Sequence, residues 1–175
     1  VTRRILANKG IEVSLEEVTA VFERIYQGVG EAPGLRETER LIPERDMLER
    51  LARLFPLGIV TGRPRRDAER FLSAAGIRGL FGAMITMEDG PLKPDPAPLV
   101  AVMKTLGVER AWFIGDTPDD IVAARRAGVL PIGCLAPAEF ADEAKGSGVS
   151  LATQSLYQSG AAIVLTDINK LEELL

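Results

Sequence analysis

The stretch that decides the fold is Ala111-Trp112-Phe113-Ile114-Gly115-Asp116-Thr117-Pro118-Asp119-Asp120. Its first four residues predict a short buried strand, and the Thr-Pro pair predicts the first turn of a helix. Asp116 therefore lies at a strand tip, and Gly115 before it lets the backbone turn sharply. Open parallel α/β sheets bind their ligands at this carboxyl-terminal edge. Three carboxylates within five residues supply the hard oxygen ligands that Mg²⁺ prefers.

Two interpretations of this acidic run remain open. Asp116 precedes the helix and can reach a metal ion directly, whereas Asp120 lies near the third helical position and faces back to the tip. The same residues also suit a helix start, because Thr117 is a favourable N-cap and acids in the first turn interact well with the helix dipole. The helix-start alternative is strongest for Asp119. Asp116 and Asp120 are therefore the candidate metal ligands.

Outward from this stretch, short apolar strands alternate with helices from about residue 41 to the end. The expected strands are 57–60, 83–86, 111–114, 130–135 and 163–165, and the expected helices are 44–54, 64–75, 95–107, 117–128, 139–144 and 167–175. This alternation predicts an α/β protein with a Rossmann-like, doubly wound parallel sheet. Residues 146–160 give no clear signal, and an extra helical turn and a loop both remain open there. Residues 1–40 hold only helical signals, among them the capping box Ser14-x-x-Glu17, and we expect a separate helical part there.

Other polar groups also follow strands. Thr61-Gly62 comes after strand 57–60 and offers a hydroxyl and a bare N–H, a cradle for phosphate at a helix N-terminus. Arg63 either holds a substrate carboxylate or phosphate or lies in solvent. Glu88-Asp89-Gly90 follows strand 83–86, and Lys93 then precedes the next helix. A lysine there either neutralises a carboxylate nucleophile and a phosphate oxygen or is solvated. Each of these groups follows a strand, and their order along the chain is less expected by chance than any single group.

Composition narrows the classes of function. Apolar residues make up 46% of the chain and charged residues 26%, which is typical of a globular protein. The net charge of −4 does not indicate a nucleic-acid partner. No apolar run reaches the roughly 20 residues of a membrane span. The single cysteine, Cys134, favours a cytoplasmic location. The absence of histidine argues against zinc hydrolases and Ser-His-Asp enzymes.

The ordered set Thr-Gly, Lys-Pro-Asp and Gly-Asp-x-x-x-Asp resembles the haloacid-dehalogenase superfamily, in its phosphoglycolate-phosphatase-like branch. The resemblance covers residues 41–175 as an α/β core and, less specifically, residues 1–40 as part of an α-helical cap. It implies that Thr61 and Gly62 bind phosphate, that Lys93 is the catalytic lysine, and that Asp116 and Asp120 hold Mg²⁺. The implied activity is the hydrolysis of a small phosphorylated metabolite through an aspartyl-phosphate.

The family's first motif, Asp-x-Asp-Gly after an apolar strand, does not occur in this sequence. The resemblance makes its first Asp the nucleophile and its second the general acid and base. We therefore expect both upstream of Val1, and we expect this chain alone to be inactive. The family's strand order places the absent strand centrally, between 57–60 and 111–114. The prediction is two half-sheets with unpaired inner edges, completed by an upstream segment or another chain.

Three alternatives remain open. A haloacid dehalogenase shares the fold but needs no Mg²⁺, and the carboxylates of Asp116 and Asp120 argue against it. A phosphoglucomutase-type transferase uses the same core with different cap contacts. The third alternative belongs to another class of function, in which the chain is a non-catalytic scaffold or binding module. The absence of a nucleophile from this sequence, taken literally, requires this alternative.

Overall fold

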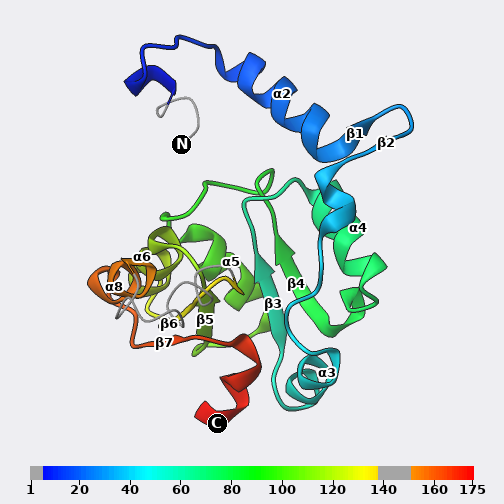
Figure 1. The fold of residues 1–175 in the computed structure, drawn as a ribbon. Helices are drawn as coiled ribbons and strands as arrows, with labels where there is room; N and C mark the ends of the chain where they lie inside the picture. The colour runs from blue at the N-terminus through cyan, green and yellow to red at the C-terminus, as the bar shows by residue number, and fades with distance from the viewer. Residues whose placement is uncertain (1–5, 138–150) are drawn as a thin grey trace. The chain divides into compact units, whose positions relative to one another are not determined.

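The structure, a computed structural model, describes residues 6–137 and 151–175 (Figure 1). It divides into two compact units, Val1–Leu41 and Ile42–Leu175. The helix predicted at 139–144 lies outside the described residues. Among the residues that are described, no helix is long and apolar enough to cross a membrane.

The smaller unit is built around one amphipathic helix. Its elements are α2 (Leu15–Gln27), β1 (Gly28–Val29), β2 (Ala32–Pro33) and the 3₁₀ helix η1 (Leu35–Thr38). The capping box predicted from the sequence is present, since the Ser14 hydroxyl accepts the N–H of Glu17 and the Glu17 carboxylate accepts the N–H of Ser14. The antiparallel hairpin of β1 and β2 was not predicted. Strands of two residues are too short to produce an alternating apolar pattern.

The larger unit alternates helices and strands. Its elements are α3 (Arg45–Leu54), β3 (Leu57–Val60), α4 (Arg65–Ala74), η2 (Arg78–Leu80), β4 (Phe81–Ile85), α5 (Ala97–Leu106), β5 (Trp112–Gly115), α6 (Pro118–Arg126), β6 (Leu130–Cys134), α8 (Leu151–Ser159), β7 (Ile163–Leu165) and η3 (Ile168–Leu174). Each predicted strand is present, with its ends shifted by at most two residues. The terminal helix predicted at 167–175 is present as a 3₁₀ helix. Helix α8 lies within residues 146–160, where the sequence pattern left a helical turn and a loop both open.

The strands form two separate parallel sheets. Strand β3 pairs with β4, while β5, β6 and β7 pair in that order. Within residues 6–137 and 151–175, no strand pairs with the second edge of β3 or of β5. The break therefore lies where the resemblance places an additional strand.

Helices cover both faces of the sheets, as the alternation of side chains along the strands shows. In β5, Phe113 packs with the cluster from α5 and α6, whereas Ile114 packs with the cluster that contains α3. In β6, Ile132 belongs to the α3 cluster, and Gly133 leaves room for Leu156 of α8. Neighbouring residues of a strand point to opposite faces. Helix α3 therefore covers one face, and α5, α6 and α8 cover the other.

Helix α3 and the C-terminal helix η3 hold the two sheets together. The side chains of Met47, Leu51, Ile132, Leu165 and Leu171 form one buried cluster, against which Leu57 of β3 and Ile114 of β5 pack. The Arg50 guanidinium of α3 donates to both carboxylate oxygens of Glu172 in η3, at 2.9 and 2.6 Å. Strands β3 and β5 are thus connected through packed helices in place of direct strand pairing.

Candidate active site

The candidate site lies at the carboxyl-terminal ends of β3 and β5. Thr61 directly follows β3, and Asp116 directly follows β5. The parallel register places Val60 opposite Ile85 and Gly115 opposite Gly133, so each strand ends level with its neighbour. This is the edge at which parallel α/β sheets bind ligands.

Lys93 connects the ends of the two half-sheets. Its Nζ forms an ion pair with Asp120 Oδ1 and lies 3.5 Å from the carbonyl oxygen of Val60. The same nitrogen lies 5.4 Å from the centroid of the Phe113 ring, within range of a cation–π interaction. One half-buried ammonium thus contacts the residue before Thr61, the middle of β5 and the first turn of α6.

Asp120 is a buried carboxylate whose two oxygens both face protein groups. The residue is 3% exposed. Its Oδ2 accepts the N–H of Thr117 at 3.0 Å and the Thr117 hydroxyl at 2.7 Å. Its Oδ1 makes no hydrogen bond of regular geometry and is paired with Lys93 by charge. Burial acts to raise the pKa of Asp120, but the Lys93 ammonium and the Thr117 donors outweigh it and lower the pKa.

The geometry therefore gives Asp120 a clear partner other than a metal. Thr117 and Asp120 form a capping box at the start of α6, which is the helix-start alternative left open by the sequence. Direct binding of a metal by Asp120 stays a prediction, and the observed contacts favour a role in holding Lys93.

Gly115 has a different function from the one that the sequence suggested. Its φ is not positive, so no sharp left-handed turn requires glycine here. Instead, a Cβ at position 115 would lie 2.2 Å from Cβ of Asp120. Glycine is needed because Asp120 packs directly against the end of β5.

Asp116 is exposed at the tip of β5 and acts on its surroundings through its charge. Burial raises the pKa of the Cys134 thiol to about 11, and the negative charges of Asp116 and Asp167 add to this effect. Mg²⁺ usually takes one or two carboxylates together with water and phosphate oxygens, so Asp116 suits one such position. Within the described residues, no group of three or more His, Cys, Asp or Glu side chains could hold a metal ion.

Thr61, Gly62 and Arg63 form a turn that precedes helix α4, here called the Thr61 turn. The Thr61 hydroxyl oxygen accepts the N–H of Arg63 at 3.2 Å, so the hydroxyl proton points away from that N–H. Gly62 is exposed, and a Cβ there would meet only Leu92, at 4.0 Å. The Arg63 guanidinium lies 5.6 Å from the Phe71 ring centroid.

The phosphate cradle predicted at Thr61 and Gly62 stays a prediction, and the structure shows what occupies the helix N-terminus beside it. Helix α4 begins at Arg65, after the Thr61 turn, and the N–H of Arg65 bonds to the Glu88 carboxylate at 3.1 Å. The first amide of α4 is therefore occupied by a protein carboxylate. The Thr61 hydroxyl and the Gly62 N–H lie in the turn before this amide.

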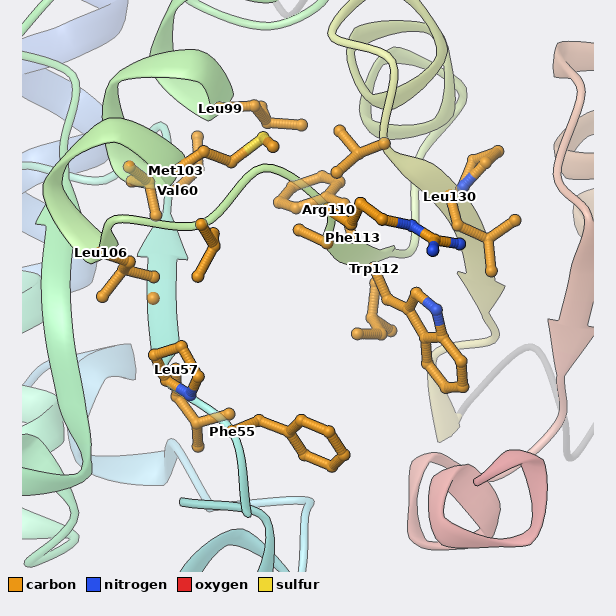
Figure 2. A pocket seen from close by; sticks show the side chains of 18 of the residues that line it. Phe55, Leu57, Val60, Leu99, Met103, Leu106, Arg110, Trp112, Phe113 and Leu130 are labelled. Atoms are coloured by element: carbon orange, nitrogen blue, oxygen red, sulfur yellow. The ribbon is translucent and has the colours of Figure 1, made fainter. Parts of the chain in front are cut away.

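A groove of about 850 Å³ separates β3 from β5 (Figure 2). Figure 2 shows Leu57 and Val60 of β3 on one side of it and Trp112 and Phe113 of β5 on the other. Helix α5 lines it with the apolar side chains of Leu99, Val102, Met103 and Leu106. The end near Val60 and Phe113 lies beside the Lys93 ammonium. The groove therefore leads to the candidate site.

The groove is bounded by two open strand edges. The N–H of Thr61 bonds to Ile85 of β4, and the N–H of Leu130 at the start of β6 bonds to Ala111. The N–H and C=O of one residue point to the same side of a strand, and the side alternates from residue to residue. The main-chain groups directed into the groove therefore belong to Gly58, Val60, Trp112 and Ile114.

Sequence comparisons give one family and relatives with different descriptions. Residues 2–134 match the family model of haloacid dehalogenase-like hydrolases. The chain is 45% identical over 157 residues to an imidazoleglycerol-phosphate dehydratase of Phytophthora nicotianae, a match over 87% of this chain and 35% of that protein. It is 37% identical over 122 residues to a phosphoglycolate phosphatase of Haemophilus influenzae, over 67% and 54%. The chain thus spans about half or less of the length of these two relatives.

Solved structures show the same fold. A predicted phosphoglycolate phosphatase from Haemophilus somnus matches 97% of this chain and 71% of its own, with a TM-score of 0.68 and 23% identity. A hydrolase of the same superfamily from Ehrlichia chaffeensis matches 98% and 70%, with a TM-score of 0.60 and 18% identity. At these identities the likeness concerns the arrangement of helices and strands.

Proposed function

Because the chain belongs to the haloacid dehalogenase-like hydrolase family, we propose that the protein is a Mg²⁺-dependent phosphatase of a small phosphomonoester. The observation that carries the proposal is the position of Lys93, which lies between the end of β3 and the buried carboxylate of Asp120. A fixed ammonium beside a turn with a hydroxyl and a bare N–H is suited to the charge that develops on phosphoryl oxygens. The phosphoglycolate phosphatases among the relatives support this class of substrate.

The proposal gives each site residue a separate task. The Thr61 hydroxyl and the Gly62 N–H donate to the phosphoryl oxygens, and Lys93 neutralises part of their charge. Arg63 holds a carboxylate or a second anionic group of the substrate. Asp116 binds Mg²⁺, which when present offsets the negative charge between nucleophile and phosphate.

We further propose that a parallel strand occupies the groove and brings the nucleophile to the strand ends. The open edges of β3 and β5, the apolar lining and the adjacent Lys93 support this occupant. Its side chains would be apolar on both faces, as in other buried parallel strands. The source is an upstream segment or another chain, and the strand ends in the two Asp residues that the family resemblance implies.

The reaction then proceeds in two displacements at phosphorus. A carboxylate oxygen of the first Asp forms a bond to phosphorus, and the ester P–O bond breaks. The second Asp donates its proton to the leaving alkoxide and then removes a proton from water, whose oxygen attacks the aspartyl-phosphate. Inorganic phosphate leaves, and both Asp residues return to their initial states.

The dehydratase description of the Phytophthora protein is not carried over to this chain. The match covers 35% of that protein, and its name describes the whole. The dehalogenase alternative is disfavoured by the exposed Asp116 carboxylate. The scaffold alternative makes a simple prediction, since it requires that no phosphomonoester be hydrolysed at any Mg²⁺ concentration.

The test is the release of phosphate from phosphoglycolate and from a generic aryl phosphate, with Mg²⁺ and with excess chelator, by the protein completed with the segment or chain that supplies the two Asp residues. We expect release that requires the metal and that falls at least about a hundredfold in Asp116→Ala. Hydrogen exchange tests the strand separately, because the amides of Gly58, Val60, Trp112 and Ile114 are protected only if a strand pairs with them. Hydrolysis unchanged in Asp116→Ala would remove the metal assignment.

A further inference from the structure

The segment after β4 continues the ladder between β3 and β4 beyond the ends of both strands. The N–H of Thr61 bonds to the Ile85 carbonyl at 3.0 Å, and the N–H of Met87 bonds to the Arg63 carbonyl at 3.3 Å. The next rung is made by a side chain, since the N–H of Arg65 donates to both carboxylate oxygens of Glu88 at 3.1 Å. Every second residue from 61 to 65 is therefore tied to the segment 85–89.

A second contact, between Arg65 and Asp89, also ties the segment 85–89 to the start of α4. The Arg65 guanidinium donates to Asp89 Oδ2 at 2.5 Å. That oxygen also accepts the N–H and the hydroxyl of Thr86, each at 2.7 Å. Thr86 is 3% exposed, so the anchor of this contact is buried in the core. Asp89 thus fixes Arg65 relative to the end of β4.

These bonds determine where the Thr61 turn lies. Within the turn, Gly62 is exposed and the N–H of Arg63 donates to the Thr61 hydroxyl. Its two ends are held by Ile85 and by Glu88. Donors to a phosphoryl group act well only when they are held in place before the reaction. A turn of this kind needs support from residues that do not touch the substrate.

We infer that Glu88 and Asp89 are positioning residues, which hold the Thr61 hydroxyl and the Gly62 N–H in the geometry that binds a phosphoryl group. The inference rests on the proposed phosphate site and adds residues to which nothing else assigns a role. The hydrogen bonds from Thr86 and from Arg65 lower the pKa of both carboxyl groups, so both are charged at neutral pH. Glu88 also occupies the first amide of α4, which leaves the turn as the place for the phosphate.

The test compares Glu88→Ala, Glu88→Gln and Arg65→Ala with the parent protein. Glu88→Ala removes the acceptor for the Arg65 N–H, whereas Glu88→Gln retains one acceptor oxygen. Arg65→Ala keeps the main-chain N–H and removes only the contact with Asp89. Glu109→Ala, at an exposed carboxylate in the loop before β5, is the matched control.

The first readout needs neither substrate nor activity. In Glu88→Ala, amide exchange at Gly62 and Arg63 is expected to accelerate about tenfold, with Glu88→Gln near the parent and Glu109→Ala unchanged. Arg65→Ala is expected to give a smaller acceleration at the same two amides. Unchanged exchange at Gly62 and Arg63 in Glu88→Ala would overturn the inference, whether or not the protein is a phosphatase.

The second readout is the dissociation constant for inorganic phosphate, followed at the Gly62 amide. Glu88→Ala is expected to raise it about fivefold, the effect of one hydrogen bond. In a Thr61→Ala background the same substitution is expected to change it less than twofold, because Glu88 acts through the turn. An effect of equal size in both backgrounds would assign Glu88 a general structural role and contradict the inference. Absence of phosphomonoester hydrolysis in the parent, once it is completed with the strand that carries the two Asp residues, contradicts the proposed function alone.

Discussion

Lys93 and Asp120 form an ion pair at the ends of the strands, in which the Asp120 side chain is almost fully buried and the Lys93 side chain is one-fifth exposed. Lys93 follows β4, and Asp120 belongs to α6 beyond β5. The pair therefore joins the loop of one half-sheet to the first turn of a helix on the other. The pair lies mostly out of solvent, so removal of the Asp120 carboxylate leaves the Lys93 ammonium without its charge partner and with little contact to water.

Asp120→Asn is expected to lower the free energy of unfolding by about 3 kcal/mol, the usual cost of removing one partner from a buried ion pair. The measurement is urea denaturation at pH 7, followed by circular dichroism. Asp119→Asn is the control, because Asp119 is the exposed neighbour on the same helical turn. The control is expected to change stability by less than about 0.5 kcal/mol. Equal losses in the two variants would show that the pair with Lys93 contributes little.

The same pair makes stability depend on pH in the acid range. The pKa of folded Asp120 is lowered by Lys93 and Thr117 despite burial, so the carboxylate stabilises the fold above its unfolded pKa of about 3.9. That contribution is lost as the pH falls below this value and through the folded pKa. The difference in unfolding free energy between the parent and Asp120→Asn is expected to shrink between pH 7 and pH 3. A difference that stays constant over this range would contradict the assignment.

Gly115→Ala is expected to destabilise the protein by about 2 kcal/mol, because the new methyl group overlaps Asp120. Gly79→Ala is the matched control, since a Cβ at Gly79 meets nothing within 4 Å. Thermal unfolding of both variants measures the difference. In Gly115→Ala, phosphate affinity should fall as well, because Asp120 shifts and takes Lys93 with it. Unfolding at the parent temperature would mean that the chain relaxes around the methyl group at no cost.

The sequence predicted the elements that depend on local pattern. The strands of the larger unit, the helices α3 to α6 and the Ser14 capping box follow from apolar spacing and from residues near in sequence. The break between β3 and β5 was also predicted, although from family resemblance and not from the residues alone. Predicting these features requires only the apolar periodicity of the chain or the order of strands known for the family.

The roles of Glu88 and Gly115 could not be predicted from the sequence. Glu88 acts on the N–H of Arg65, which is distant in sequence, and Gly115 is required by a contact with the side chain of Asp120. Both depend on the register of β3 with β4 and on the closeness of α6 to β5. The pattern around Asp120 suits both a metal ligand and a helix cap; the structure shows the cap with Thr117 and a pair with Lys93, and the metal role stays a prediction.

Cys134 is expected to react slowly with iodoacetamide near neutral pH. Burial and the charges of Asp116 and Asp167 raise the pKa of its thiol to about 11, and only the thiolate reacts rapidly. The rate should rise with pH towards a midpoint near this value. Asp116→Asn removes one nearby negative charge and is expected to move the midpoint to lower pH, whereas Asp119→Asn leaves it in place. An unchanged midpoint in Asp116→Asn would contradict the closeness of the two side chains.

In the protein completed with the strand that carries the two Asp residues, Thr61→Val is expected to lower kcat/KM for a phosphomonoester about a hundredfold, since it removes one fixed donor to the phosphoryl group at nearly constant volume. Thr61→Ser keeps the hydroxyl and should remain within about tenfold of the parent. Both variants keep the main-chain bond to Ile85, so the unfolding temperature serves as the control for the fold. Because the hydroxyl oxygen accepts the N–H of Arg63, Thr61→Val should also speed amide exchange at Arg63. Full activity in Thr61→Val would show that the phosphate does not bind at the Thr61 turn. The phosphate site proposed at the end of β3 would then be wrong.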